Sequence, residues 1–160
     1  MPVRCTFTLN SKETSTLVCE GFGTVEAFSG QKEGRDRPTE VSTPKIGPIP
    51  PGIYYLVDRR SGGLMGWAYD AAGRYFGLTT DRHKWFALWN PETGDTTMVH
   101  GVKRGNFRLH PVGPAGRSEG CITLVNPGEF EYLQRFVRRS PPVLPVPGSD
   151  LKAYGTVQVR

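Results

Sequence analysis

The fold is decided by the stretch RGNFRLHPVGPAGRSEGCITL, residues 104–124. Its alternation around Leu109 predicts one short strand, and the apolar run at residues 122–125 predicts a second. The letters PVGPAG between them are rich in residues that turn the chain, so we expect a loop there. A strand, a tight loop and a strand would bring His110 and Cys121 close together.

Such closeness is what a thiol nucleophile requires. The thiolate is the reactive species, and a neighbouring imidazole lowers the thiol pKa and accepts its proton. Gly120 lets the backbone bend sharply, so that the amides of Gly120 and Cys121 are directed at a developing oxyanion. Ser118 is placed to orient the imidazole or to donate to a substrate. The alternative is that Cys121 is a small buried residue leading into a core strand.

The segment FRLHPVGPAGRSEGCITL resembles the signature of the Tlde1 family. These are small L,D-transpeptidase-like effectors of bacterial type VI secretion, formerly a domain of unknown function. Further pieces agree in order, namely GFG at 21–23, AFSG at 27–30 and GPIPPGIYYLVDR at 47–59. The match covers nearly the whole chain. The resemblance implies a cysteine enzyme with a fold related to the YkuD L,D-transpeptidases, acting on the stem peptides of peptidoglycan.

Two features depart from the YkuD pattern. YkuD enzymes usually carry a second histidine directly before the Gly-Cys pair, where this chain has Glu119. They also place the catalytic histidine in a strand element that Val99-His100-Gly101 resembles. In the effector family the counterpart is the histidine of the His-Pro pair, here His110. We therefore expect His110 to be the base, with His100 as the alternative.

The resemblance also implies a reaction. Cys121 would attack the carbonyl of the third residue of a tetrapeptide stem and release the terminal D-alanine. Hydrolysis of the thioester would leave a tripeptide, whereas attack by a free D-amino acid would exchange the terminal residue. Arg108 and Arg117 are candidates for holding the D-alanine carboxylate, or they are solvated surface charges. A secretion-system component and an immunity protein are the implied protein partners.

Size and composition set the class of protein. A chain of 160 residues is long enough for one domain, residues 1–160, and we expect a monomer. Its 37% hydrophobic residues, 20 glycines and 14 prolines predict a turn-rich, mostly β protein. After Asn126 an apolar stripe at three- and four-residue spacing, formed by Phe130, Leu133, Phe136 and Val137, predicts one main C-terminal helix, so the fold class is α+β and predominantly β. The expected segments are an N-terminal hairpin and strands at 3–59, the catalytic motif at 97–125, the helix at 127–139 and a last strand at 151–159.

The net charge of +5 suits an acidic polymer, which can be nucleic acid, an anionic membrane or the peptidoglycan wall. A basic nucleic-acid-binding domain and a noncatalytic wall-binding module are therefore the alternative classes of protein. The set formed by His110, Ser118, Gly120 and Cys121 argues against both. Since no RNA-binding fingerprint is present either, we expect no nucleic-acid partner.

Alternating polar and apolar residues in the first twenty positions predict a β-hairpin with a polar turn. Folding it about Lys12 places Cys5 opposite Cys19. The two cysteines then form either a disulfide, which an oxidising periplasm permits, or two packed thiols. In both cases Cys121 stays unpaired. After this hairpin the periodicity is lost between residues 26 and 43, which predicts a polar loop. The resemblance to the Tlde1 family implies that this loop borders the active-site cleft, and a plain surface loop is the alternative.

No C-x-x-C or H-x-x-x-H spacing occurs, so we expect neither a metal nor another cofactor. Asp81 and Asp95 are further candidates for orienting a histidine. No apolar run reaches membrane-spanning length, and no apolar signal segment follows Met1. We expect export without a Sec signal, by a contractile secretion machine, and action in the periplasm of a target bacterium.

Overall fold

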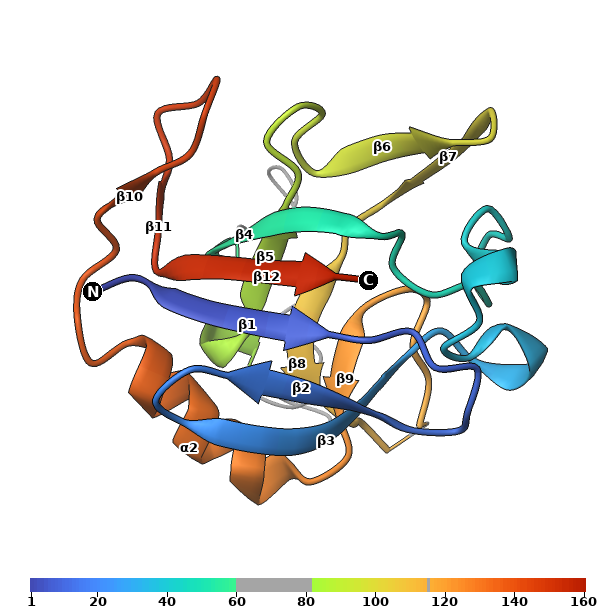
Figure 1. The fold of residues 1–160 in the computed structure, drawn as a ribbon, viewed down its shortest axis with the longest axis horizontal. Helices are drawn as coiled ribbons and strands as arrows, with labels where there is room; N and C mark the ends of the chain where they lie inside the picture. Colours follow the sequence, from blue (N-terminus) through green and yellow to red (C-terminus); the bar gives the residue numbers. More distant parts are fainter. Residues whose placement is uncertain (60–81, 115) are drawn as a thin grey trace.

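A computed structural model describes residues 1–59, 82–114 and 116–160 of the chain. Eight strands of this part close into a barrel: β1 (Val3–Phe7), β2 (Ser15–Cys19), β3 (Gly23–Ser29), β4 (Gly52–Asp58), β5 (Phe86–Trp89), β8 (Arg108–Pro111), β9 (Ile122–Leu124) and β12 (Gly155–Val159). The strand order around it is β1-β12-β4-β5-β8-β9-β3-β2 (Figure 1). The prediction of a β-rich fold with one main helix is confirmed.

The barrel encloses the core. Alternate residues of each strand point inward, and the fully buried ones include Phe7, Leu17, Leu56, Leu109 and Leu124. Burying one such side chain contributes roughly 1.5–3 kcal/mol. Closure also leaves the sheet of the barrel without an open edge, where backbone groups would otherwise be unpaired.

The helix α2 (Pro127–Val137) packs on this core through Phe130, Leu133 and Val137. It is capped by Asn126, whose side chain accepts hydrogen bonds from the backbone N–H groups of Gly128 and Glu129 at 2.8 and 3.3 Å. It ends two residues before the expected position 139, because the chain leaves helical geometry ahead of the proline pair at 141–142.

Strand β3 extends into the segment where the sequence predicts a loop. Its last three residues, Ala27, Phe28 and Ser29, are all buried, so the polar–apolar alternation of a half-exposed strand is missing. The outward side chain of Phe28 is covered by the Arg35 guanidinium, which lies 4.0 Å from the ring centroid. Burial on both faces is therefore why periodicity fails to reveal this strand.

The two strands of the central motif pair with each other in parallel, with His110 opposite Thr123 in the register. Parallel pairing requires the chain to cross back before it enters the second strand. The segment between β8 and β9, of which residues 112–114 and 116–121 are described, leads back to the start of β9, so the predicted strands are present and pair in parallel.

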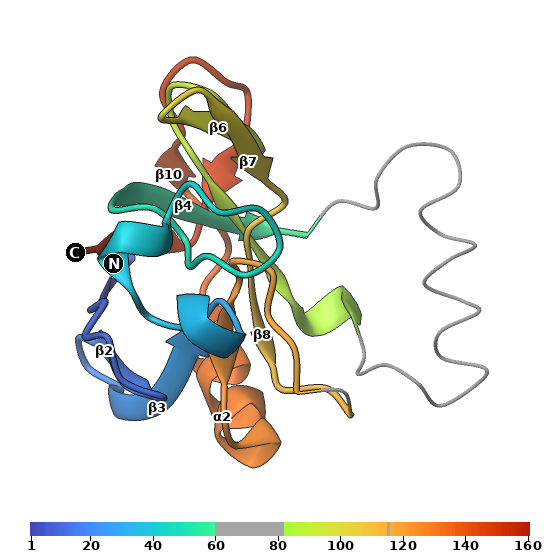
Figure 2. The ribbon, with the colours of Figure 1, turned by 90° about the vertical axis from the view of Figure 1, so that its right-hand side faces the viewer.

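Smaller elements extend from the barrel. They are the hairpin β6 (Thr96–Val99) and β7 (Val102–Gly105), the pair β10 (Leu144–Pro145) and β11 (Lys152–Ala153), and the 3₁₀ turns η1 (Lys32–Gly34), η2 (Pro38–Glu40) and η3 (Arg82–Lys84). The β6–β7 hairpin and α2 lie at opposite ends of the molecule (Figures 1 and 2). The expected last strand at 151–159 is divided into β11 and β12. None of the described helices is long and apolar enough to cross a membrane.

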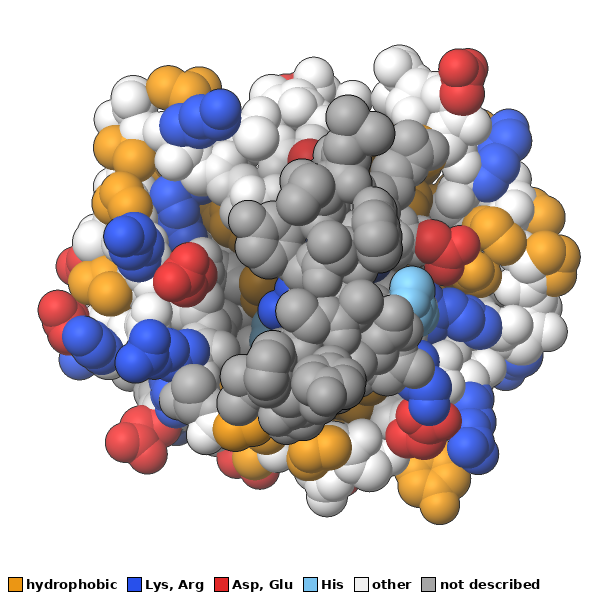
Figure 3. Space-filling model, turned by 180° about the vertical axis from the view of Figure 1, so that it is seen from behind, with side chains coloured by type: hydrophobic (Ala, Val, Ile, Leu, Met, Phe, Trp, Pro, Cys, Tyr) orange, Lys and Arg blue, Asp and Glu red, His pale blue; other side chains and the backbone are white. Residues whose placement is uncertain are grey.

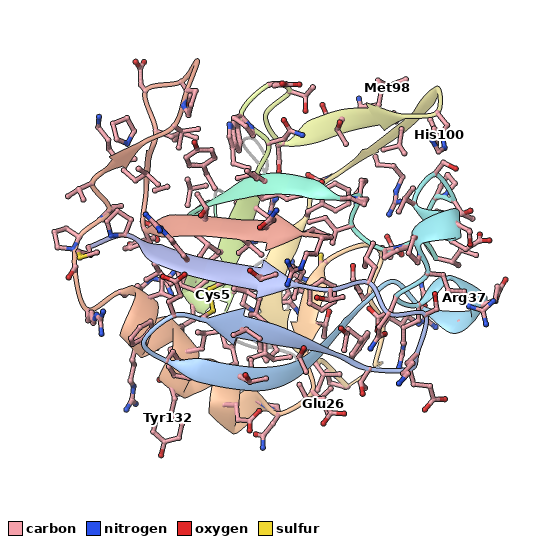
Figure 4. All side chains as sticks on the ribbon, viewed as in Figure 1. Cys5, Glu26, Arg37, Met98, His100 and Tyr132 are labelled. Atoms are coloured by element: carbon pink, nitrogen blue, oxygen red, sulfur yellow. A yellow bond between two sulfur atoms is a disulfide. The ribbon has the colours of Figure 1, made fainter. Side chains whose placement is uncertain are left out.

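Cys5 and Cys19 lie directly opposite each other on β1 and β2, and their sulfur atoms form a disulfide of 2.01 Å (Figure 4). Both side chains are buried within the barrel. Cys121 remains a free thiol.

Candidate functional site

The free thiol lies at the entrance to β9. Because Ile122 and Leu124 point into the barrel, Cys121 and Thr123 lie on its outer face. The Cys121 side chain is partly exposed, and its thiol donates to the carbonyl of Asn106 at 3.7 Å. A nucleophile in this position is supported by rigid strands while one side of the sulfur stays open.

The carbonyl groups on either side of Gly120 are held from inside the molecule. The Arg104 guanidinium donates to the carbonyl of Glu119 at 3.3 Å, and the Ser29 hydroxyl donates to the carbonyl of Gly120 at 3.1 Å. In a trans peptide the N–H points away from the preceding carbonyl. The amides of Gly120 and Cys121 are thus directed away from these donors. Within residues 1–59, 82–114 and 116–160, neither amide has an acceptor, so both can bind an oxyanion.

Ser118 holds the same turn together. Its buried hydroxyl donates to the carbonyl of Cys121 at 2.8 Å and accepts from the N–H of Gly30 at 3.2 Å. A hydroxyl has one proton to donate, and here that proton is used on the backbone. The predicted contact between Ser118 and the imidazole of His110 is not formed, and the role of Ser118 in this structure is to fix the shape of the loop.

Gly120 cannot carry a side chain in this arrangement. Its φ is +112°, a conformation that residues with a Cβ rarely adopt. A Cβ would lie 2.6 Å from Nη2 of Arg104 and 2.8 Å from the ring of Phe107. The expectation that this position needs glycine is therefore explained by both backbone geometry and close packing.

Arg104 is the buried centre of this support. Its guanidinium donates to backbone carbonyls in three separate segments, those of Val41, Gly47, Pro48 and Glu119. Burial lowers the pKa of this side chain. Sequence reasoning missed Arg104. The chain has 20 lysines and arginines, and no feature of the neighbouring sequence shows that this arginine is buried.

His110 occupies β8 and is buried, with its ring stacked on Trp85 at a centroid distance of 4.3 Å. Its Nδ1 lies 2.7 Å from the carbonyl oxygen of Pro111. A carbonyl only accepts hydrogen bonds, so Nδ1 carries the proton of the neutral ring and the lone pair is on Nε2. The pKa of His110 is lowered to about 4, mainly by burial and in smaller part by the nearby charge of Arg82, while the contact with Pro111 opposes the change. The ring is therefore neutral at pH 7.

The lone pair of His110 faces Thr123, whose Oγ1 lies 3.5 Å from Nε2. Cys121 is two residues before Thr123, just ahead of β9, and lies on the same face as Thr123. The structure thus places the predicted nucleophile, just ahead of β9, near the predicted base on the adjacent strand β8. Among the described residues, no hydrogen bond joins the two side chains directly, and the hydroxyl of Thr123 is the group nearest the free nitrogen.

Burial raises the pKa of the Cys121 thiol to about 11. The amide and guanidinium of Arg108 oppose this effect, whereas the carboxylates of Glu119 and Asp95 add to it. The resting site therefore contains a neutral thiol and a neutral imidazole. A reaction of this thiol as a nucleophile would therefore begin with proton transfer from a neutral thiol to a neutral imidazole acting as general base.

The two candidate carboxylate ligands differ in availability. Arg108 is paired in a bidentate manner with Asp95, at 2.6 and 2.9 Å, so its fork is occupied. Asp95 is thus engaged by an arginine and does not orient a histidine, while Asp81 lies outside the described residues. Arg117 is exposed, and in the described part of the chain it has no ion-pair or hydrogen-bond partner. Arg117 is the better placed of the two to receive a substrate carboxylate.

His100 forms the turn of the β6–β7 hairpin. With a φ of 47°, followed by Gly101 at 79°, it has the left-handed geometry of a two-residue hairpin turn. The side chain is exposed at the tip of this hairpin (Figure 4). The strand expected for Val99-His100-Gly101 ends at Val99, so His100 is on neither of the two strands that carry the site.

A second buried group that sequence reasoning missed is Asp36. Its Oδ1 accepts from the N–H of Ser29 at 2.8 Å, and its Oδ2 has no partner among the described residues. Burial raises the pKa of this carboxyl to about 7. Ser29 in turn holds the carbonyl of Gly120, so Asp36 lies directly beneath the loop that positions the thiol.

The described residues contain no cluster of three or more His, Cys, Asp or Glu side chains arranged to hold a metal ion. The chain matches a protein-family model described as the Tlde1 domain over residues 23–149. The matched segment includes the whole of the site. No curated protein and no solved structure matches the chain.

Proposed function

The chain belongs to the Tlde1 domain family, and we propose that it is a cysteine enzyme of the L,D-transpeptidase kind that trims or exchanges the end of peptidoglycan tetrapeptide stems. The observation that carries the proposal is the Gly120–Cys121 turn. It combines a partly exposed thiol with two amides that have no acceptor among the described residues, and a neutral imidazole lies on the neighbouring strand.

Acylation begins with Cys121 attacking the carbonyl carbon of the third stem residue. His110 accepts the thiol proton at Nε2, which is unprotonated because Nδ1 donates to Pro111. The carbonyl oxygen becomes an oxyanion that the amides of Gly120 and Cys121 stabilise. Collapse breaks the peptide bond to the terminal D-alanine, whose nitrogen takes the proton from His110, and a thioester remains.

Deacylation decides the product. Water attacks the thioester with His110 as base, which regenerates the thiol and leaves a tripeptide stem. A free D-amino acid attacks in the same way through its amine, and the terminal residue is exchanged. In both cases Arg117 is the proposed contact for the carboxylate of the terminal residue, because the fork of Arg108 is occupied by Asp95.

Loss of intact tetrapeptides would deprive a growing wall of donor stems. We therefore propose an antibacterial role in the periplasm of a target cell, with delivery by a type VI secretion system and neutralisation in the producer by an immunity protein. A fold relationship to the YkuD enzymes is part of the same proposal. The eight-stranded barrel and the family match are its support.

The test is mass spectrometry of tetrapeptide muropeptides incubated with the wild type and with Cys121→Ala, His110→Ala and His100→Ala, each with and without D-methionine. We expect loss of D-alanine, or its replacement by D-methionine, with the wild type and with His100→Ala. Cys121→Ala and His110→Ala should be inactive. Unchanged muropeptides with the wild type would contradict the proposal.

A noncatalytic wall-binding module is the second candidate. It is favoured by the raised pKa of Cys121 and by the missing direct bond to His110. The alkylation rate of Cys121 by iodoacetamide distinguishes the two. An enzyme should be protected from alkylation when a tetrapeptide that ends in an uncleavable bond is bound, because the carbonyl of its third residue then covers the thiol. A binding module should react slowly with or without the peptide.

A further inference from the structure

A basic cleft lies at one end of the barrel, formed by two loops. The turn between β1 and β2 contributes Ser11, Lys12 and Glu13, and the segment that includes η1 contributes Lys32, Arg35 and Arg37. Together they line a hollow of about 390 Å³. Figure 4 shows Arg37 directed outward from this end of the molecule. None of these residues belongs to the site around Cys121.

The walls of the cleft are fixed to each other and to the core. The N–H of Ser11 donates to the carbonyl of Asp36 at 2.8 Å, which joins the two loops. The Arg35 guanidinium stacks on the buried ring of Phe28. The cationic groups are therefore held near one another by backbone that is already ordered, which reduces the entropic cost of binding a ligand.

The charge in the cleft is unbalanced. Lys12, Lys32, Arg35 and Arg37 face a single carboxylate, that of Glu13. Across the described ranges, none of these five side chains forms an ion pair. Like charges this close repel one another, so an anion that enters the cleft relieves the repulsion. Figure 3 shows lysine and arginine side chains at many places on the back of the molecule, and four of the chain's 20 lysines and arginines line this one hollow.

We propose that this cleft is a second binding site, for clustered carboxylates of the peptidoglycan wall. The lining is polar and cationic, which excludes apolar ligands, and the two guanidinium groups match carboxylates in a bidentate manner. The choice of the wall as the source rests on the proposed function, in which stem peptides with free carboxylates are the substrate. The cleft holds the protein on the polymer while Cys121 acts on individual stems.

The cleft is connected to the site around Cys121, which supports the proposal that both bind the same polymer. The segment from Ser29 to Arg37 carries three of the four cations, and its first residue donates to the carbonyl of Gly120. A ligand in the cleft therefore binds to the same loop that shapes the Cys121 turn.

The experiment is co-sedimentation with purified sacculi, using the full chain with Cys121→Ala so that no turnover occurs. The cleft variant is Lys12→Gln/Lys32→Gln/Arg37→Gln, which leaves the stacked Arg35 in place. The matched control is Arg4→Gln/Lys103→Gln/Lys152→Gln, which removes the same charge from exposed positions on β1, β7 and β11. Circular dichroism establishes that both variants are folded.

We expect the cleft variant to bind sacculi about tenfold more weakly and the control to bind within about twofold of the parent. Sacculi whose stem carboxylates have been converted to amides should bind the parent as weakly as the cleft variant binds native sacculi. If the two variants lost the same amount of binding to sacculi, the attraction would depend on overall charge, and the proposal of a binding site in the cleft would be wrong. Undiminished binding to amidated sacculi, displaced by inorganic phosphate, would overturn the choice of carboxylate. Because Cys121 is absent throughout, these outcomes are independent of whether the wild type turns over stems.

Discussion

Replacing Arg104 by leucine removes the donors of four backbone carbonyls, those of Val41, Gly47, Pro48 and Glu119. A buried carbonyl left without a donor costs about 1–3 kcal/mol. Two of the bonds are long, at 3.2 and 3.3 Å, and the variant no longer has to bury a charge, so the losses do not add in full. We expect a net loss of roughly 3–5 kcal/mol in the free energy of unfolding.

Urea denaturation of the oxidised protein measures this loss, and thermal denaturation provides a second reading. For a chain of this size 1 kcal/mol corresponds to about 2–4 °C, so Tm should fall by roughly 10–15 °C. The control is Arg135→Leu, since that side chain is 68% exposed and should change stability by about 0.5 kcal/mol or less. Arg104→Lys has one ammonium nitrogen in place of the guanidinium group, so its loss of unfolding free energy should lie between those of the wild type and Arg104→Leu. A loss below about 1 kcal/mol for Arg104→Leu would refute the argument that this guanidinium holds the loops together.

Three further predictions concern the same framework. Gly120→Ala should lose about 3 kcal/mol of stability and all turnover, because its Cβ would lie 2.6 Å from Nη2 of Arg104 at a φ of +112°. Asp36 holds its proton more tightly when folded, so the stability it contributes is present below pH 3.8 and is lost as the pH rises to about 7. The free energy of unfolding of Asp36→Asn, measured by urea denaturation, should therefore rise relative to that of the wild type by up to about 4 kcal/mol when the pH is raised from 4 to 7.5. Reduction of the Cys5–Cys19 disulfide, which closes a loop with a sequence separation of 14, should cost about 3 kcal/mol.

Each of these has a contrary outcome. A Gly120→Ala variant with wild-type stability would mean that the loop has room for a side chain. If the stability difference between Asp36→Asn and the wild type were the same at pH 4 and pH 7.5, the carboxyl would not be buried as described. An unchanged unfolding midpoint after reduction, with free thiols counted by alkylation, would mean that the disulfide does not constrain the unfolded chain.

Local sequence patterns were sufficient to predict several of the secondary-structure elements. The period of two in the first twenty residues predicts the β1–β2 hairpin and sets Cys5 opposite Cys19. The apolar stripe after Asn126 predicts α2, because packing on a barrel requires one apolar face. In both cases the signal is contained within a short segment, so sequence alone carries it.

The support for the thiol depends on contacts that no local pattern reports. Ser29 and Gly120 are 91 residues apart, and Arg104 and Gly47 are 57 apart. Their side chains look like ordinary polar residues until the barrel brings the segments together. The connection between β8 and β9 is a related case. Its sequence is compatible with a tight turn or with a crossing connection. The parallel pairing that places Thr123 opposite His110 depends on the rest of the sheet.

The central claim is that the thiol of Cys121 becomes acylated by the stem peptide. The most direct measurement is the intact mass of the protein after mixing with a tetrapeptide stem and quenching in acid within seconds. We predict an added mass equal to the stem without its terminal D-alanine, located at Cys121 by peptide mapping and absent from Cys121→Ala. Release of D-alanine by Cys121→Ala at the wild-type rate, or turnover by the wild type without any adduct at this residue, would contradict the claim.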